Sequence, residues 1–328
     1  MAWFSKTVRE SPGERPRAGG EVTREHVIWA YRLLLDREPE SEDAVLPKVH
    51  GCATTRQLRA ELMNSAEFRE KNPDYAHTND PTVVIKPYPS GLRICVDLSD
   101  HLIGLPILRD QYEPDARRFV EQTVRQGQHV LDVGAHIGFF TLHMATRVGS
   151  SGSVTAFEPF PRNADLLARS IAENRFDAFV RLHRAAVGAR GTTGRLAFAR
   201  ETLNTGGAFL LPDAGAAPGE LSTAPVPVVA LDELDLPRPV SFVKMDVEGA
   251  EPLVVEGARR LLASDRPIVL SEVHGAQLAA VAGRSAAGFI GALSALGYEC
   301  RTLTADGPGE KVDPATLGPV TTVVFVPR

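Results

Sequence analysis

Four short segments of the sequence carry side chains that could bind or transform a small ligand, and each lies at the end of an apolar run that predicts a β-strand. The first is a glycine turn, from Gly134 to Gly138, that opens a predicted helix. An α/β fold binds its ligands beyond the carboxyl ends of such strands. A dinucleotide fingerprint would have a glycine in place of His136, so that the backbone could touch a pyrophosphate. The turn therefore favours a ligand without pyrophosphate, of which S-adenosylmethionine is the common one.

The second segment places a carboxylate at the end of the next predicted strand. Glu158 follows the apolar run Val154-Thr-Ala-Phe. A carboxylate at this point can accept hydrogen bonds from both hydroxyls of a ribose. Alone, the turn could be an ordinary loop and the acid a solvated strand end. Together and in this order, they predict that the chain binds a nucleoside-type cofactor.

The third segment concentrates acids behind one strand. The run Phe242-Val-Lys-Met-Asp-Val-Glu-Gly-Ala-Glu contains Asp246, Glu248 and Glu251 at its end. Neighbouring like charges raise one another's pKa, which suits a general base near neutral pH. The alternative is a helix cap, and it fits Glu251, which precedes Pro252 in the predicted first turn. It fits Asp246 less well.

The fourth segment ends a further apolar strand, Ile268-Val-Leu-Ser-Glu-Val-His, with Glu272 and His274. Residues two apart point to the same side of a strand. Since neighbouring strands lie about 4.8 Å apart, both side chains could converge with Asp246 on one point beyond the sheet. Such a group could relay a proton or hold a cation, although a lone strand-end histidine is more often structural.

Alternating strand and helix patterns place these segments on a parallel sheet covered by helices on both faces, which is an α/β fold. Strands are predicted at 129–133, 153–158, 179–187, 240–246, 267–273, 298–304 and 320–326, with helices at 115–126, 139–147, 162–174, 250–263 and 284–296. The connection 305–319 is rich in glycine and proline and has no helical pattern. We therefore expect the last strand to pair with 298–304 as an antiparallel hairpin.

The first quarter of the chain differs from the rest in composition and in the pattern of apolar residues. Residues 1–20 are polar and predict a flexible arm without a secretory signal. Residues 21–75 predict a small helical module, and four prolines over 73–90 indicate a linker after it. We expect the catalytic domain to cover 76–328, with lead-in strands at 82–108.

Within the helical module, two helices are predicted. Val27 and Tyr31 recur at helical spacing in the first. The second should begin at Thr54, with Gln57 completing a capping box. Its apolar face would bury Leu58, Leu62 and Phe68.

The composition excludes several classes of protein. The 328 residues are 43% hydrophobic and 23% charged, which is enough apolar material for a sizeable core. A net charge of −5 argues against a nucleic-acid partner, which needs a basic excess. Three cysteines without a CxxC pair exclude a disulfide framework and favour a cytoplasmic location. No apolar run reaches the ~18 residues of a membrane span.

In this order and spacing, the four segments resemble the FkbM family of S-adenosylmethionine-dependent methyltransferases. The most specific string is Lys244-Met-Asp-Val-Glu-Gly-Ala-Glu251, close to the family's Lys-x-Asp-Val-Glu-Gly-x-Glu. Asp132-Val-Gly-Ala-His-Ile-Gly138, Phe157-Glu-Pro159 and Leu231-Asp-Glu-Leu234 stand at family spacing. His136 departs from the pattern, because the family more often has asparagine there.

The helical module separately resembles a small domain attached to glycan-modifying enzymes. Its marks are Tyr31-Arg-Leu-Leu-Leu-Asp-Arg-Glu-Pro39 and Ser65-Ala-Glu-Phe68. This resemblance assigns the module no defined activity.

The FkbM resemblance implies a class I methyltransferase (Rossmann-like) fold, a seven-stranded sheet with an antiparallel last strand. It also implies O-methyl transfer to a hydroxyl of a sugar, glycan or natural product. An alternative is an inactive cofactor-binding module that partners glycan-biosynthesis enzymes, and the intact acid cluster argues against it. Relatives that methylate nucleic-acid bases carry Asp/Asn-Pro-Pro-aromatic where this chain has Asp246-Val-Glu-Gly. We expect a small-molecule or glycan acceptor and no nucleic acid, with a homo-oligomer left open.

These inferences assign roles to individual residues. The expected catalytic residues are Asp246, His274 and Glu272. The residues expected to bind the methyl donor are Asp132, Gly134, His136, Gly138, Glu158 and Asp246. Those expected at the acceptor are Glu248, Asn204 and Tyr112. A metal-free base is preferred to Mg²⁺, whose ligands would be Asp246 and Glu272.

Overall fold

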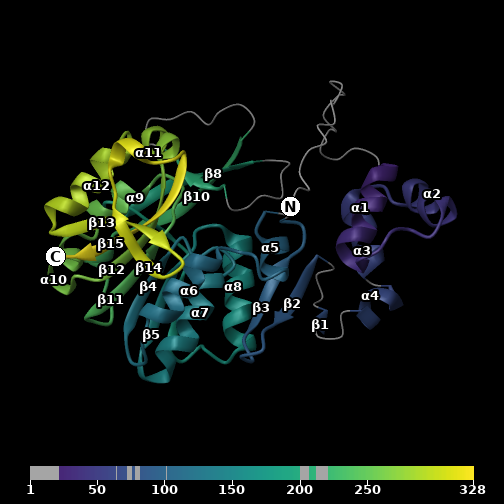
Figure 1. Ribbon diagram of the computed structural model, residues 1–328, viewed down its shortest axis with the longest axis horizontal. Helices are drawn as coiled ribbons and strands as arrows, with labels where there is room; N and C mark the ends of the chain where they lie inside the picture. Colours follow the sequence, from purple (N-terminus) through teal and green to yellow (C-terminus); the bar gives the residue numbers. More distant parts are fainter. Residues whose placement is uncertain are drawn as a thin grey trace, which may run out of the picture. The chain divides into compact units, whose positions relative to one another are not determined.

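The computed structural model describes residues 22–63, 65–71, 76–77, 82–100, 102–199, 207–211 and 221–328. Its contacts divide the chain into two units, Met1–Asn72 and Pro73–Arg328 (Figure 1). Each unit has its own set of buried apolar side chains. The residues that the sequence analysis connects with chemistry all belong to the second unit.

The first unit is helical. Its described helices are α1 (Arg24–Leu35), α2 (Glu42–Gly51), α3 (Thr55–Met63) and α4 (Ala66–Lys71). The Thr54 hydroxyl accepts a hydrogen bond from the Gln57 N–H at 3.2 Å, so α3 begins at the predicted cap. Phe68 is buried as expected but lies on the separate helix α4. The sequence analysis missed α2, which contains Pro47 and buries only Val45.

The second unit is built on an eight-stranded sheet with the order β14-β13-β15-β12-β11-β4-β5-β6. Its strands are β4 (His129–Val133), β5 (Ser153–Phe157), β6 (Val180–His183), β11 (Val240–Met245), β12 (Ile268–His274), β13 (Tyr298–Thr304), β14 (Gly307–Lys311) and β15 (Val320–Pro327). Pairing is parallel from β6 to β12, whereas β15 runs antiparallel to both β12 and β13. The α/β class I methyltransferase fold is therefore confirmed, including its antiparallel last strand.

The strand count of seven was too low. Residues Gly307–Lys311 form the additional strand β14, which pairs antiparallel with β13 at the edge of the sheet. The sequence predicted a loop here because glycine and proline dominate the segment. At an edge, a strand needs partners on one side only, so Pro308 is tolerated.

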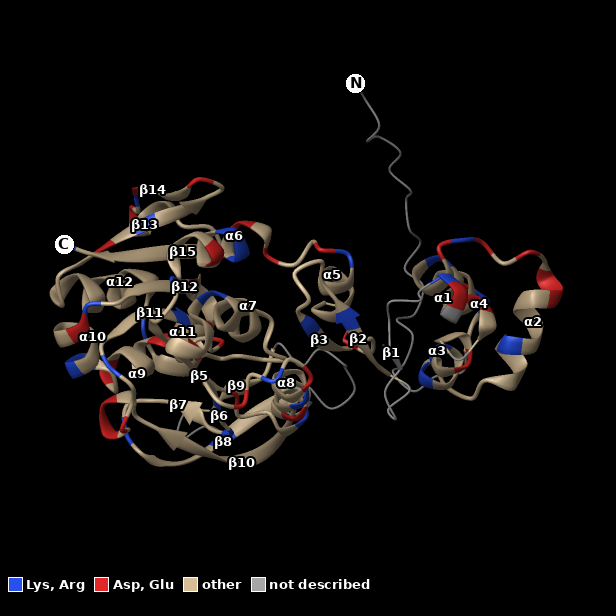
Figure 2. Cartoon of the chain, turned by 90° about the horizontal axis from the view of Figure 1, so that it is seen from below, with Lys and Arg blue, Asp and Glu red and all other residues tan. Residues whose placement is uncertain are grey.

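Helices pack on both faces of this sheet (Figure 2). One face carries α6 (Pro114–Thr123), α7 (Phe139–Val148) and α8 (Pro161–Glu173), and the other carries α9 (Glu251–Glu256), α10 (Arg259–Asp265) and α12 (Ala286–Ala295). The single helix predicted at 250–263 is broken into α9 and α10 at Gly257. A Cβ at that glycine would lie 2.0 Å from the Gly188 carbonyl oxygen, so the chain passes too closely for a side chain.

A second, four-stranded sheet fills the stretch in which the sequence showed no clear pattern. Its order is β7-β10-β8-β9, with β7 (Ala186–Val187), β8 (Thr192–Ala199), β9 (Phe209–Leu210) and β10 (Leu221–Val229). The predicted strand 179–187 is thus two strands, β6 and β7, in different sheets. Pro225 and Pro227 on β10 obscured its strand pattern, because proline cannot donate to a ladder.

The lead-in segment contains strands and a short helix. β1 (Ala76–His77), β2 (Val83–Pro87) and β3 (Arg93–Asp97) form an antiparallel sheet, and α5 (Gly104–Leu108) follows. The Cys95 N–H donates to the Ser170 hydroxyl on α8 at 2.9 Å. The buried Lys86 ammonium donates to the Ile107 and Leu108 carbonyls at the end of α5. The first contact attaches the lead-in segment to α8, and the second joins β2 to α5 within the segment.

Within the described ranges, no single helix is long and apolar enough to cross a membrane. The helices α11 (Gly275–Ala282) and α12 are long and apolar enough only when taken together, and the chain bends by 79° at the break between them.

The division after Asn72 leads to a first prediction. A chain that begins at Pro73 should fold with one cooperative thermal transition, because each unit has its own buried core. Circular dichroism against temperature, beside the full-length chain, measures this. A truncated chain that is insoluble or melts without cooperativity would show that the first unit belongs to the core of the second.

Candidate functional site

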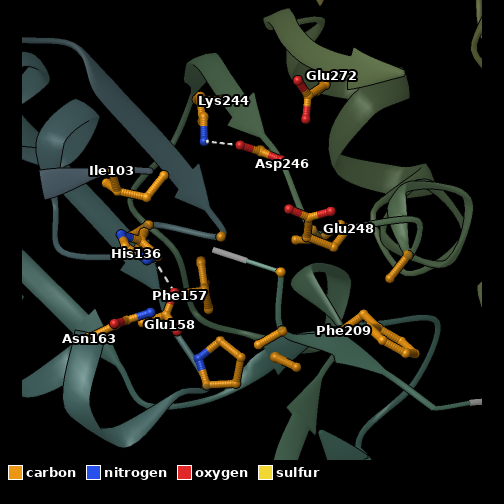
Figure 3. Close-up of a pocket in the computed structure, with 18 of the residues that line it drawn as sticks. Ile103, His136, Phe157, Glu158, Asn163, Phe209, Lys244, Asp246, Glu248 and Glu272 are labelled. Carbon is orange, nitrogen blue, oxygen red and sulfur yellow. Dashed lines mark hydrogen bonds and ion pairs between the residues drawn. The ribbon is translucent and has the colours of Figure 1, made fainter. Parts of the chain in front are cut away.

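A cavity of about 460 Å³ lies beyond the carboxyl ends of β4, β5, β11 and β12. The chain segments that line it come from the glycine turn, the lead-in segment, the second sheet and the ends of β11 and β12 (Figure 3). Two groups of polar side chains lie in it. The glycine-turn end comprises Gly134, His136, Glu158 and Asn163. The acid end comprises Tyr112, Glu113, Lys244, Asp246, Glu248, Glu272 and His274.

The glycine turn lies directly against the end of β11. Gly134 has φ +82°, and a Cβ there would lie 1.8 Å from the Asp246 carbonyl oxygen. The Asp246 N–H in turn donates to the Val133 carbonyl at 3.0 Å. Only a glycine at position 134 permits this close approach, because any other residue would carry a Cβ. The contact brings the two ends of the cavity together.

Gly138 and Asp132 support the turn without lining the cavity. A Cβ at Gly138 would lie 2.2 Å from the Leu167 side chain, so this glycine allows α7 and α8 to pack closely. Asp132 is fully buried, and its Oδ2 accepts the Thr141 hydroxyl at 2.5 Å. Burial raises the pKa of Asp132. Both residues therefore lie behind the turn that lines the cavity, and their part in binding the methyl donor stays a prediction.

Glu158 reaches the cavity from the end of β5. Its two carboxylate oxygens accept the backbone N–H groups of His136 and Phe160, each at 2.8 Å. Asn163, which the sequence analysis missed, also hydrogen-bonds it and lines the cavity. Burial raises the pKa of Glu158 to about 7, although these hydrogen bonds act in the opposite direction. The carboxylate is thus fixed in orientation, and the three donors leave it one lone pair for a ligand hydroxyl.

His136 adopts a left-handed backbone, with φ 52°. Its side chain is 18% exposed, and its Nε2 lies 3.8 Å from Asp100 Oδ2. Burial lowers the pKa of His136 to about 4, so the imidazole is neutral at pH 7. The left-handed conformation is one that asparagine also adopts readily, so histidine can replace asparagine here without a change of turn.

At the acid end, Asp246 pairs with the ammonium of Lys244, whose Nζ lies 3.1 Å from Asp246 Oδ2 (Figure 3). The Lys244 side chain is 8% exposed, and its Nζ lies 5.1 Å from the centre of the Phe140 ring. Burial favours the neutral amine, but Asp246, Asp132 and Glu113 together raise the pKa of Lys244. Lys244 is therefore charged.

Three further carboxyl groups lie at the acid end. Burial, reinforced by Asp246, raises the pKa of Glu248 and of Glu272 to about 7. Burial likewise raises the pKa of Glu113. Glu272 lies one position beyond the last paired residues of β11 and β12, beside Asp246. A carboxyl group with a pKa near 7 is suited to accept a proton at neutral pH.

The remaining acids and histidine fill different places. Glu251 is buried, and its Oε1 accepts the Val247 N–H at 3.0 Å, so it stabilises the turn that precedes α9. His274 lines the cavity from the end of β12, two residues beyond Glu272. Tyr112 also lines it, with its ring 5.0 Å from that of Phe139. Asn204, expected at the acceptor, lies outside the described residues.

Several cavity residues carry no sequence signal. Gln277, on α11, hydrogen-bonds Glu248, and Phe209 comes from the second sheet. The lead-in segment contributes Leu102 and Ile103. Each is isolated in the sequence, so only tertiary structure brings it to the site. The sequence alone could have indicated Glu113 as a cavity residue, because it adjoins Tyr112 just before a predicted helix.

The described residues contain no group of three or more histidine, cysteine, aspartate or glutamate side chains placed to hold a metal ion. Asp246 and Glu272, the ligands considered for Mg²⁺, therefore lack a third protein ligand there.

Comparison with solved structures finds methyltransferases. The FkbM methyltransferase from Methylobacillus flagellatus is 15% identical, with a TM-score of 0.40, over 91% of this chain and 58% of that one. This chain thus spans less than two thirds of that protein. The O-methyltransferase from Bacillus cereus in complex with SAH is 15% identical, with a TM-score of 0.36, over 65% of this chain and 81% of that one. A putative rRNA methylase from Clostridium thermocellum is 10% identical, with a TM-score of 0.41, over 65% of this chain and 93% of that one.

These likenesses are distant, and the strand order above carries the fold assignment. A search of curated proteins found no match. The profile of the methyltransferase FkbM domain, in contrast, matches residues 132–300, which include the glycine turn, Glu158, the acid cluster and the end of β12. The chain therefore belongs to the FkbM family of S-adenosylmethionine-dependent methyltransferases.

Proposed function

We propose that the protein transfers the methyl group of S-adenosylmethionine to a hydroxyl of a sugar, glycan or natural product. The observation that supports this most is the backbone contact between Gly134 and Asp246, because it joins a nucleoside-type site and a group of possible bases in one cavity. A hydroxyl is a poor nucleophile until its proton leaves, so it requires such a base.

The glycine-turn end fits the methyl donor. Glu158 is fixed by two backbone N–H groups and by Asn163, and its remaining lone pair would accept a ribose hydroxyl. The turn at Gly134 would lie beside the amino-acid part of the donor, and the neutral His136 ring would contact it without adding charge. When bound, the donor supplies an electrophilic methyl group and a thioether leaving group.

At the acid end, the chain would orient the acceptor and remove its proton. Methyl transfer forms a carbon–oxygen bond and breaks the carbon–sulfur bond, whose electron pair stays on sulfur. The hydroxyl proton moves to a carboxylate. Glu272 is the best-supported base, because its pKa is about 7, whereas Asp246 is paired with Lys244. Glu248, Tyr112 and His274 would position the acceptor.

A direct test uses S-adenosylmethionine labelled with ¹³C at the methyl group and a panel of hexoses, 6-deoxyhexoses and hexuronic acids. We expect an O-methyl carbon resonance in the product of at least one member, together with S-adenosylhomocysteine. Transfer to amine acceptors only would replace O-methylation by N-methylation. Donor binding without transfer to any acceptor class would favour the inactive cofactor-binding module.

Loss of the Glu158 carboxylate should weaken donor binding. Glu158→Ala removes a charge-assisted hydrogen bond to ribose, worth roughly 1.5–3 kcal/mol, so the Kd for S-adenosylhomocysteine should rise by at least about tenfold. Isothermal titration calorimetry measures this. Asp165→Ala on α8 is the matched control, since Asp165 is exposed and pairs with Arg184 on the surface. Equal affinity of both variants would place the ribose elsewhere.

Asp246→Asn keeps the shape of the side chain but removes its charge. If Asp246 acts in the transfer, kcat should fall by about 10²–10⁴, while the Kd for S-adenosylhomocysteine stays within about threefold. Steady-state kinetics with the acceptor found in the panel, beside calorimetry, separate the two effects. Full activity in this variant would reduce Asp246 to a structural role.

The rate should also depend on pH through Glu272. A carboxylate accepts a proton only when ionised, so kcat should rise with pH through about 7 and be lost as pH falls below it. Glu272→Gln should lower kcat and abolish the acidic limb of the profile, which is the fall of kcat below about pH 7. Glu248→Gln is the matched comparison, because burial gives Glu248 a similar pKa of about 7. If the acidic limb disappears in Glu248→Gln and persists in Glu272→Gln, Glu248 is the base.

A further inference from the structure

Lys244 is the only lysine or arginine among the described residues that line the cavity. It is nearly buried, and its Nζ lies 3.1 Å from Asp246 Oδ2. The transfer proposed above gives it no part. A charged lysine removed from water nevertheless requires compensating partners, which suggests that the fold maintains it for a reason.

Besides Asp246, two neighbouring elements, β4 and α7, place side chains around the ammonium. Lys244 is the register partner of the buried Asp132, so β4 places a carboxyl group beside β11. Asp132 Oδ1 has no hydrogen-bond partner among the described residues, so no other donor there competes with the ammonium for this oxygen. On α7, the Phe140 ring faces Nζ at 5.1 Å, a cation–π distance. Lys244 therefore links the strand beneath the glycine turn to Asp246.

The charges around the ammonium are predominantly acidic. The titratable groups that face it are Asp132 on β4, His136 in the glycine turn, Glu113 before α6, Asp246 and Glu248 after β11, and Glu272 on β12. Lys244 lowers the pKa of Glu113, Glu248 and Glu272, and so opposes the effect of burial on each.

We propose that Lys244 is a positioning residue for methyl transfer: its ammonium fixes the Asp246 carboxylate at the acid end and keeps the neighbouring carboxylates available to accept a proton. It acts through Asp246 and Glu272 and does not touch the reacting atoms. This role rests on the proposed O-methyl transfer. Without the ammonium, the acids at this end would retain protons at neutral pH and could not take one from the acceptor.

The test compares Lys244→Met, which keeps the length and loses the charge, with Lys244→Arg, which keeps the charge. In Lys244→Met, kcat at pH 7 should fall at least about tenfold, and the acidic limb of the kcat profile should move up by about one pH unit. The limb should return toward its wild-type position in Lys244→Arg. The Kd for S-adenosylhomocysteine should stay within about threefold in both. A slower Lys244→Met with an unmoved limb would overturn the proposal, since lost packing alone does not shift a titration.

A second measurement needs no acceptor. In protein labelled with ¹³C at the glutamate carboxyl carbons and saturated with S-adenosylhomocysteine, the Glu272 resonance, assigned with Glu272→Gln, reports its titration directly. Its midpoint should rise in Lys244→Met, and an unchanged midpoint would refute the electrostatic role. If Lys244→Met does not fold, Lys244→Gln takes its place with the same expected shift. Failure of the wild type to methylate any hydroxyl would defeat the proposed function and leave this titration result standing.

Discussion

The site depends on one steric constraint, the contact of the Gly134 turn with the end of β11. No Cβ fits at Gly134, because the Asp246 carbonyl oxygen would lie 1.8 Å away, and φ at this residue is +82°. Two backbone segments that are remote in sequence therefore meet without side chains between them. The Asp246 N–H closes the contact on the Val133 carbonyl. Because the strand ends meet in this way, a nucleoside-type site and a cluster of acids open into the same cavity rather than into two separate clefts.

Electrostatics then distinguishes carboxyl groups of similar type within that cavity. Burial acts on all of them and favours the protonated form. Glu158 is fixed by backbone N–H groups, which orients it for hydroxyl donors. Asp246 is held by the ammonium of Lys244, whereas Glu272 forms no such ion pair with another described residue, and burial raises its pKa to about 7. The local partner of each carboxylate, rather than its residue type, thus determines its orientation and the direction of its pKa shift.

Much of the fold could be predicted because its signals are local. The glycine turn, the strand-end acids and the alternation of strands with helices identified the α/β sheet and its antiparallel last strand. The failures also have local causes. Proline residues obscured β10 and α2, and glycine-rich sequence obscured β14. At Gly257 the close approach of Gly188 breaks a helix that periodicity alone would continue. In each case tertiary packing outweighed propensity.

By itself, the sequence determined which strand ends line the cavity, because parallel strands bring their carboxyl ends to one edge and Glu158, Asp246, Glu272 and His274 all lie at such ends. It could not determine which of these residues face a ligand and which support those that do. Asp132 and Gly138 belong to the same motif as Gly134, yet they are packed behind the turn. Gln277, Asn163 and Phe209 reach the cavity from segments without a motif. Only the tertiary structure decides these placements, because burial, and the pKa shifts that follow from it, depend on neighbours that are distant in the chain.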